Sequence, residues 1–239
     1  MNVIVYRDKP GLALAAARRV ADTISASDRQ VRIGLAGGST PAETYRLLRE
    51  MAVDWERVDA WVSDERWVPH EHTDCNGTMI AQLLMDHVPA SFHRPRWATW
   101  LSAADSAAHY EAALRSIHPD GGSELILLGM GDDGHTASLF PGTEALEADP
   151  RRWYVENYVP QAGAERLTAT YSFLHQAHEI AFLVSGGDKA SALREVLEPV
   201  EGTTPPPAAR VMDGHAEVTW LVDEAAAAEL DATELTRGD

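Results

Sequence analysis

The stretch GMGDDGHTASLFPG, residues 129–142, contains two patterns with different chemical implications. Gly129, Gly131 and Gly134 form a GxGxxG, the spacing of a dinucleotide-binding turn. His135 follows the last glycine, and Asp133 lies two positions before the histidine. A histidine beside a carboxylate is suited to proton transfer near neutral pH, because the carboxylate stabilises the charged imidazole. The stretch therefore favours either cofactor binding or acid–base catalysis.

A dinucleotide turn needs a long helix directly after its glycines and no charge that repels the pyrophosphate. Here Asp132 and Asp133 would face the pyrophosphate, and Pro141 would end any helix within two turns. Glu156 lies near the distance expected of a ribose ligand, so spacing alone does not exclude the motif. The negative charges and the short helix argue against a dinucleotide-binding turn. The sequence predicts no dinucleotide cofactor and a catalytic role for His135, with a structural, helix-capping histidine as the open alternative.

A second candidate lies in the segment AGGSTP, residues 36–41. Gly37 and Gly38 allow a ligand to approach the backbone closely, and the N–H groups of a following helix would point at it. The hydroxyls of Ser39 and Thr40 add further donors. The segment predicts an anion-binding turn, and the open alternative is an ordinary capped strand-to-helix turn.

Two cationic residues are further candidates. Lys189 lies in the first turn of a predicted helix, where the helix dipole disfavours a cation. Lysine is also rare in this chain, because only Lys9 and Lys189 among its 20 lysines and arginines are lysines. A lysine in that position suggests contact with a phosphate. Arg66 follows a predicted strand and suits a phosphate or a developing oxyanion. A salt bridge from Arg66 to the neighbouring Asp64 or Glu65 remains the alternative.

The elements that would position these residues alternate along the chain. Apolar segments predict strands at 31–38, 58–62, 124–131 and 178–187, and amphipathic segments predict helices at 40–51, around 79–84 and at 188–197. Thr40 and Glu43 have capping-box spacing, and Pro41 would take the first helical position. The pattern predicts an α/β fold of three layers, a mostly parallel doubly wound sheet with helices on both faces. The polar stretches AGGST, SDER, GDDGHT and SGGDK would then meet at one rim of the sheet.

The chain has 239 residues and a formal net charge of −17, and its isoelectric point is near 4.9. This charge argues against a general nucleic-acid or anionic-membrane partner, whereas a small anionic substrate would need a local cluster of cations. The N-terminus lacks signal-peptide order, and no run of ~18 apolar residues occurs. A single cysteine, Cys75, excludes an intramolecular disulfide. We expect one cytoplasmic domain spanning 1–239, with a frayed tail after about residue 230.

Five segments together carry a resemblance to a known family. GLAGGSTPAETY, SDERWVP, CNGTM, GMGDDGHTASLFPG and VSGGDKA resemble the 6-phosphogluconolactonases, from Val3 to about Ala225. The related glucosamine-6-phosphate deaminases share the Asp-Gly-His core but continue as GHIAFNEP, so TASLFPG sides with the lactonases. Two positions depart from the family pattern: Cys75 stands where serine is usual, and Asp132 stands where proline is common.

The resemblance implies a glucosamine-6-phosphate deaminase-like or ribose-5-phosphate isomerase-like fold and hydrolysis of 6-phospho-D-glucono-1,5-lactone to 6-phospho-D-gluconate in the oxidative pentose phosphate pathway. It implies no cofactor and no metal, a sugar-phosphate lactone as the only partner, and a monomer or weak homodimer. His135 would be the general base, Asp133 would stabilise it, and Arg66 or a backbone N–H would meet the oxyanion. The expected phosphate-binding residues are Gly37, Gly38, Ser39, Thr40, Arg166 and Lys189, with Arg210 as an alternative to Arg166.

Three other interpretations stay open from the sequence. PHEHTDC could hold a transition metal through His70, His72, Asp74 and Cys75, although it lacks a clear ligand geometry. An isomerase-deaminase acting on amino-sugar phosphates would use the same fold, and so would a non-catalytic sugar-phosphate sensor domain. No GxSxG is present, which argues against Ser138 as a nucleophile.

Overall fold

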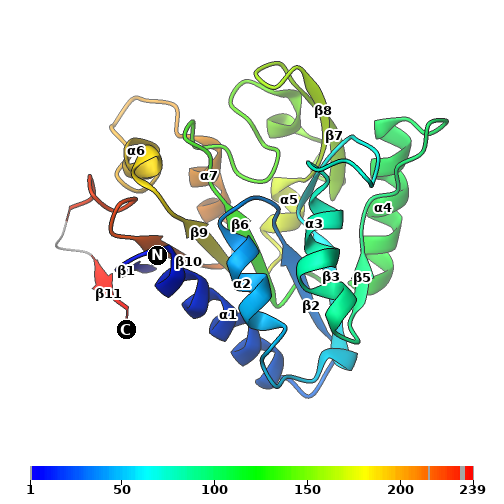
Figure 1. Cartoon of the computed structure of the whole chain (residues 1–239). Coiled ribbons are helices and arrows are strands. Elements are labelled where there is room, and N and C mark those ends of the chain that lie inside the picture. Colours follow the sequence, from blue (N-terminus) through cyan, green and yellow to red (C-terminus); the bar gives the residue numbers. More distant parts are fainter. Residues whose placement is uncertain (1, 215, 232–234, 239) are drawn as a thin grey trace.

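The architecture is dominated by one large parallel sheet (Figure 1). The computed structural model describes residues 2–214, 216–231 and 235–238. The sheet has eight strands in the order β11-β1-β10-β9-β6-β2-β3-β5, and every pairing in it is parallel. Its strands are β1 (Asn2–Tyr6), β2 (Val31–Leu35), β3 (Val58–Val62), β5 (Ser91–His93), β6 (Leu125–Gly129), β9 (Glu179–Val184), β10 (Glu217–Asp223) and β11 (Thr236–Arg237).

Helices cover both faces of this sheet. One face packs against α1 (Lys9–Ser25), α2 (Pro41–Leu48) and α3 (Asn76–Leu83). The other packs against α4 (Ala103–Ile117), α5 (Tyr171–Leu174), α6 (Ala190–Leu197) and α7 (Pro207–Arg210). Short 3₁₀ turns occur at Trp55–Arg57, Met85–His87, Glu144–Glu147, Gly187–Lys189 and Val211–Asp213. The predicted three-layer α/β class is confirmed.

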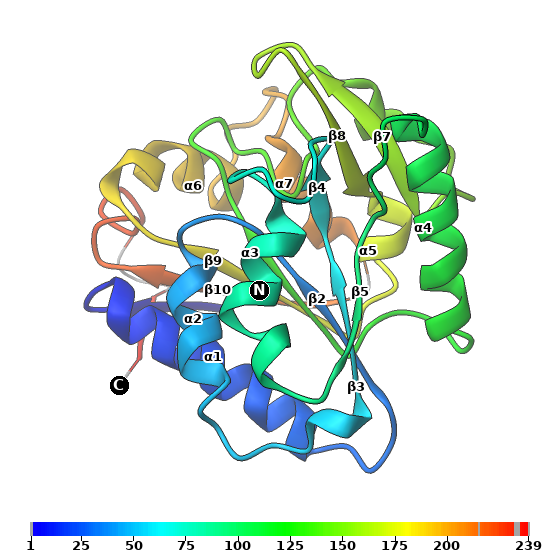
Figure 2. The same cartoon turned by 45° about the vertical axis from the view of Figure 1, so that its right-hand side comes forward.

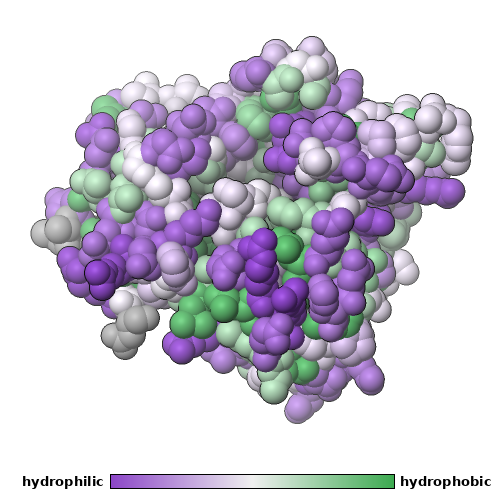
Figure 3. Space-filling model, viewed as in Figure 1, coloured by the Kyte–Doolittle hydropathy of each residue, from purple (hydrophilic) through white to green (hydrophobic). Residues whose placement is uncertain are grey.

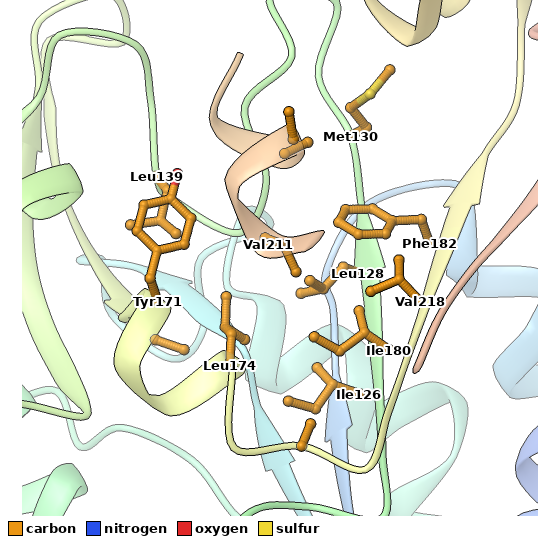
Figure 4. Close-up of a cluster of buried hydrophobic side chains, with 14 of the residues drawn as sticks. Ile126, Leu128, Met130, Leu139, Tyr171, Leu174, Ile180, Phe182, Val211 and Val218 are labelled. Atoms are coloured by element: carbon orange, nitrogen blue, oxygen red, sulfur yellow. The ribbon is translucent and has the colours of Figure 1, made fainter. Parts of the chain in front are cut away.

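The continuous apolar strands follow from burial on both sides. Successive side chains of a strand point to opposite faces. In β6, Leu125 and Leu127 face the core beneath α1 and α2, whereas Ile126 and Leu128 face the opposite core, with Phe182 of β9 beside them (Figure 4). A strand covered on both faces needs apolar residues at every position, so it lacks polar–apolar alternation.

The start of α2 differs from the prediction. Pro41 does occupy the first helical position, but Thr40 makes no side-chain capping bond, so the expected Thr40–Glu43 capping box is wrong. Thr40 has φ −71° and ψ −50°, which are helical angles, whereas a capping side chain needs an extended backbone. The hydroxyl of Thr40 therefore makes no capping bond, and Thr40 lines a neighbouring pocket.

A second, smaller sheet was not predicted. It is antiparallel, in the order β4-β8-β7, and consists of β4 (Asp64–Arg66), β7 (Tyr154–Val159) and β8 (Ala164–Ala169). Figure 2 shows the β7–β8 hairpin rising above the large sheet. The backbone N–H of Ala169 donates to the Ser63 carbonyl at 2.9 Å and so ties the hairpin to the end of β3. The polar segment SDER is thus an edge strand.

A short strand lies within the C-terminal segment that was expected to be a frayed tail. Thr236 and Arg237 form β11, which pairs with β1, and the Gly238 N–H donates to the Val5 carbonyl at 3.0 Å. Without β11, β1 would present an unpaired backbone edge. The rest of the expected tail includes residues 232–234 and 239, which lie outside the described residues.

The surface carries mainly polar side chains. Figure 3 shows hydrophilic residues over most of one face, with a smaller apolar area near its centre. Within the described ranges, no helix has both the length and the apolar character needed to cross a bilayer.

Candidate active site

The loops that follow β2, β6 and β9 leave the sheet at its carboxyl edge and surround one pocket of about 250 Å³. The edge is the upper one in Figure 1, on the side of the β7–β8 hairpin. The pocket is lined by all of the predicted site residues except Asp133: Gly37, Gly38, Ser39, Thr40, Arg66, His135, Arg166 and Lys189. The parallel sheet and the small antiparallel sheet thus together bring residues from distant parts of the chain to one pocket.

His135 and Asp133 form a direct pair in the loop after β6. Asp133 Oδ1 lies 2.5 Å from Nδ1 of His135 and also accepts the His135 backbone N–H at 3.0 Å. Partial burial acts to raise the pKa of Asp133, but these contacts from His135 outweigh it and hold that pKa below its usual value. The Asp133 carboxylate is therefore charged at neutral pH.

The charged carboxylate also selects the histidine tautomer. A carboxylate accepts hydrogen bonds only, so Nδ1 must carry the hydrogen that it donates to Asp133. Nε2 of a neutral His135 then keeps its lone pair and is able to accept a proton. The ring stacks on Phe140, with centroids 3.8 Å apart and an interplanar angle of 20°. Carboxylate and phenyl ring together set the direction in which the imidazole faces.

The glycines of this loop allow the pair to form. A Cβ on Gly131 would lie 2.1 Å from Nδ1 of His135, so any side chain there would displace the imidazole. Gly134 has a φ of +73°, a left-handed conformation that favours glycine. No helix follows the glycines within residues 130–143, and Thr136 instead bridges to Leu139. The loop therefore lacks the helix N-terminus that a dinucleotide pyrophosphate needs.

The turn after β2 is shaped for close approach of its backbone. Gly38 has a φ of +99°, and a Cβ on Gly37 would lie 1.8 Å from Oδ1 of Asn76. Asn76 itself is held by its amide N–H₂, which donates to the Asp64 carbonyl at 2.8 Å. The N-terminal end of α3 thus supports the turn that carries Ser39 and Thr40.

Two arginines stand side by side on the small sheet. Arg66 of β4 and Arg166 of β8 are directly opposite each other in the antiparallel register. The Nε atoms of both are buried and have no hydrogen-bond partner within the structure. Burial, and secondarily the Arg66 charge, lowers the pKa of Arg166. Two adjacent cations with unpaired buried donors favour an anionic ligand.

A buried carboxylate fixes the position of Arg66. Glu65 accepts the backbone N–H groups of Asn76 and Gly77, each at 2.7 Å, and that of Arg66 at 2.8 Å. These bonds lower the pKa of Glu65, but burial outweighs them and raises it. Arg66 also donates from Nη1 to the Asp74 carbonyl at 2.8 Å, so it is not salt-bridged to its neighbours as the alternative supposed.

Lys189 lines the pocket from the loop that follows β9. It ends the 3₁₀ turn Gly187–Lys189 and directly precedes α6. Its Nζ lies 3.1 Å from a carboxylate oxygen of Asp188, which is largely exposed. The pocket is therefore lined by cations from two elements, Lys189 of the loop after β9 and the arginine pair of the small sheet.

Comparison with known proteins now identifies the family. Residues 7–220 match the sequence profile of the glucosamine-6-phosphate isomerases/6-phosphogluconolactonases. The chain belongs to this family. A 6-phosphogluconolactonase of Nostoc sp. is 36% identical over 216 residues, which cover 87% of this chain and 88% of the relative. Identity to the corresponding protein of Mycobacterium leprae is 31%, over 96% of this chain and 98% of the relative.

Solved structures give the same family and a useful distinction. A 6-phosphogluconolactonase from Leishmania guyanensis has a TM-score of 0.86 at 25% identity, covering 97% of this chain and 99% of that one. A monomeric glucosamine-6-phosphate deaminase has a TM-score of 0.81 at 25% identity, covering 96% and 100%. Both kinds of family member thus share this fold, and fold alone does not choose between them.

Several residues that the sequence suggested as phosphate or metal ligands lie outside the pocket. Arg210 is paired with Glu147 at 3.0 Å and lies over the Tyr171 ring, so it does not line the pocket, unlike Arg166. In the HEHTDC segment, Cys75 lies buried with its Sγ 3.4 Å from a Glu65 oxygen. Among the described residues, no group of three or more histidine, cysteine or acidic side chains is arranged to hold a metal.

Three polar residues of the pocket were not among the predicted site residues: Asp64, Asn76 and Ser185. Asp64 is buried, and its Oδ2 accepts a hydrogen bond from Ser138 Oγ at 2.7 Å. Its position in SDER, close to Arg66, could have indicated a pocket residue, but a carboxylate in that position suggested only a salt bridge to the arginine. Ser185 likewise precedes the SGGDK glycines, and only the folded turn places it in the pocket.

Proposed function

We propose that the protein hydrolyses 6-phospho-D-glucono-1,5-lactone to 6-phospho-D-gluconate, the reaction named by its relatives. The observation that carries the proposal is the Asp133–His135 pair at a pocket that also contains three cationic side chains. A lactone that bears a phosphate needs a base for water and a cationic site for its dianion. The TASLFPG segment after His135, typical of the lactonases, supports the choice within the family.

In the proposed mechanism, Nε2 of His135 takes a proton from a water molecule as the water oxygen bonds to the lactone carbonyl carbon. The carbonyl oxygen becomes an oxyanion, and the Arg66 guanidinium or a backbone N–H stabilises it. The tetrahedral intermediate then breaks its bond to the ring oxygen, which takes the proton back from the imidazolium and becomes a hydroxyl. The new carboxylic acid loses a proton to solvent. Asp133 stabilises the imidazolium throughout.

The phosphate is proposed to bind between the β2 turn and Lys189, with Arg166 as a further contact. Ser39 and Thr40 would supply hydroxyls there, and Gly37 and Gly38 line the same pocket. Binding at this distance from the reacting carbon positions the carbonyl beside His135, since remote binding energy is used for orientation. Because the net charge of the protein is −17, binding of a phosphate requires a local cluster of cationic side chains.

A covalent route through Ser138 has little support. Its hydroxyl is buried and donates to Asp64 at 2.7 Å, and the residue does not line the pocket. A serine nucleophile would need an adjacent base and an exposed oxygen. Direct attack by water requires neither.

One assay tests the proposal. Glucose-6-phosphate dehydrogenase generates the lactone in situ, and acid release is followed above the spontaneous hydrolysis. We expect a rate proportional to protein concentration; no acceleration would contradict the proposal. The similarity to a deaminase structure makes amino-sugar-phosphate deamination the second candidate. Ammonia release from glucosamine-6-phosphate would favour that activity. Thermal shift with sugar phosphates, in the absence of either activity, would favour a sensor domain.

A further inference from the structure

Asp223 is a buried carboxylate that does not line the pocket. It is the last residue of β10, with 5% of its surface exposed. Its Oδ2 accepts the Ser185 hydroxyl at 2.5 Å, its Oδ1 accepts the Ala226 N–H at 2.8 Å, and both oxygens lie 3.1 Å from the Gly186 nitrogen. The carboxylate thus connects the end of β10 to the loop after the neighbouring strand β9.

The loop that Asp223 holds is the one that carries Lys189. Ser185 lines the pocket, and Gly186 starts the turn with a φ of +104°. The Gly186 carbonyl in turn accepts the backbone N–H of Lys189 at 3.1 Å. A continuous chain of hydrogen bonds therefore runs from Asp223 through Gly186 to Lys189.

We propose that Asp223 is a positioning residue for phosphate binding: it holds the Ser185–Lys189 turn so that the Lys189 ammonium faces the bound phosphate. The inference rests on the proposed function, because it requires the phosphate to bind beside Lys189. Asp223 does not line the pocket and acts through the turn.

The chemistry of the site requires a carboxylate at this position. All of the groups that face Asp223 are donors: one hydroxyl and two backbone N–H groups. An ionised carboxylate is an acceptor on both oxygens, whereas an asparagine amide places an N–H₂ where one oxygen was. Because the Gly186 nitrogen lies 3.1 Å from both carboxylate oxygens, that N–H₂ would face the Gly186 N–H in either orientation of the amide. The loop would have to move to separate the two donors. Asp223→Asn is therefore nearly isosteric yet disrupts the turn.

The test compares two substrates of Asp223→Asn, the phosphorylated lactone and unphosphorylated glucono-1,5-lactone. Misplacing a binding group by about 1 Å can cost up to ~100-fold, so we expect the KM for the phosphorylated lactone to rise about 10- to 100-fold. We expect little change in its kcat and little change in kcat/KM for the unphosphorylated lactone. A purely structural role would lower the activity toward both lactones in parallel.

Glu111→Gln is the matched control. Glu111 is a carboxylate of similar burial that holds Arg115 and Arg152, and it does not line the pocket. Its replacement should lower the thermal midpoint while keeping the wild-type ratio between the two lactones. Gly186→Ala provides a second variant in case Asp223→Asn does not fold. It strains the same turn, since a Cβ there would lie 2.6 Å from Asp188 Oδ1, and should produce the same selective rise in KM.

Lys189→Ala separates failure of the inference from failure of the proposed function. If Asp223 acts through the turn, the double variant Lys189→Ala/Asp223→Asn should be less impaired than the two single effects combined predict. The inference is overturned if Lys189→Ala raises KM but folded Asp223→Asn and Gly186→Ala retain wild-type selectivity for the phosphorylated lactone. If Lys189→Ala itself leaves that selectivity unchanged, the proposed phosphate site is wrong and the inference fails with it.

Discussion

At the scale of single residues, the chemistry depends on which imidazole nitrogen is free. The 2.5 Å contact between Asp133 and Nδ1 of His135 leaves Nε2 as the basic atom, and stacking on Phe140 restricts the ring. Asp133 is placed to orient and stabilise the histidine, and it does not line the pocket. Its role and that of His135 stay predictions until tested by substitution.

The first prediction concerns His135→Asn. Asparagine approximates the size of the imidazole but cannot accept and return a proton near neutral pH. We expect turnover to fall ~10²–10⁴-fold, while affinity for 6-phosphogluconate changes little because the phosphate contacts persist. Steady-state kinetics with spontaneous hydrolysis subtracted, together with circular dichroism and product binding, provide the measurement. Near-wild-type turnover in a folded variant would direct the search for a base to Asp133.

The second prediction concerns Lys189→Ala. A charge-assisted hydrogen bond contributes about 1.5–3 kcal/mol, so we expect binding of the phosphorylated lactone to weaken roughly 10- to 150-fold. The unphosphorylated lactone should be hydrolysed as before. The ratio of kcat/KM for the two lactones is the quantity to measure, with Lys9→Ala, at a partly buried position outside the pocket, as the control. A wild-type ratio in Lys189→Ala would show that Lys189 does not contribute to binding of the phosphate.

At the scale of elements, the antiparallel β4-β8-β7 sheet determines the cationic side of the pocket. Pairing of β4 with β8 sets Arg66 against Arg166, although 100 residues separate them. The β6 loop carries His135, the proposed base, and Gly131 is necessary there because a side chain would occupy the space of the imidazole. Each proposed catalytic group is thus positioned by a different connection.

The third prediction belongs to α4 and uses a buried histidine. Nδ1 of His118 lies 2.8 Å from the Leu114 carbonyl, and Nε2 lies 2.9 Å from Ser123 Oγ, which also accepts the Trp61 N–H. Burial lowers the pKa of His118 to about 4, despite the opposing effect of the Leu114 carbonyl. The unfolded chain binds the proton near pH 6.5, so folding is favoured fully above that pH and less as pH falls toward 4.

We expect up to about 3 kcal/mol of unfolding free energy to be lost across this window because of His118. Denaturant unfolding at several pH values measures it. His118→Gln should be less stable overall but should have a shallower dependence on pH between 6.5 and 4. His109→Gln, at an exposed position of the same helix, should keep the wild-type dependence. Equal slopes in all three proteins would show that His118 is not the titrating group.

At the scale of the whole molecule, an acidic protein has three cationic side chains in the proposed substrate pocket. Its net charge of −17 repels anions in general, so the attraction for a phosphorylated substrate must come from the local arrangement of Lys189, Arg66 and Arg166. The proposed mechanism also uses only the protein's own side chains.

The fourth prediction is that metal is dispensable for the whole enzyme. A lactone is an activated ester-like acyl group, so a histidine base and hydrogen-bond donors suffice for water attack. The side chain of Cys75, a candidate ligand, lies instead against Glu65. Exhaustive chelation followed by the lactonase assay should leave the rate intact, with chelator added to the spontaneous reaction as the control. A loss of activity that zinc or manganese restores would contradict the prediction.

The sequence by itself determined the fold class and most of the pocket. The apolar strands predicted a parallel sheet, and parallel strands place their carboxyl ends at one edge, so AGGST, SDER, GDDGHT and SGGDK could be placed together without coordinates. Family resemblance then suggested roles for His135 and Asp133. These predictions depend on local pattern and topology, which a sequence contains.

Tertiary structure alone decided the rest. The antiparallel sheet, the pairing of Arg66 with Arg166 and the bonds from Asp223 to the Lys189 turn all join residues far apart in the chain. A polar residue such as Asp64 or Asp223 has the same local pattern whether it is solvated or buried, because its burial depends on which distant donors surround it. The Thr40–Glu43 spacing shows the converse: the local pattern was present, but Thr40 has helical backbone angles and makes no capping bond.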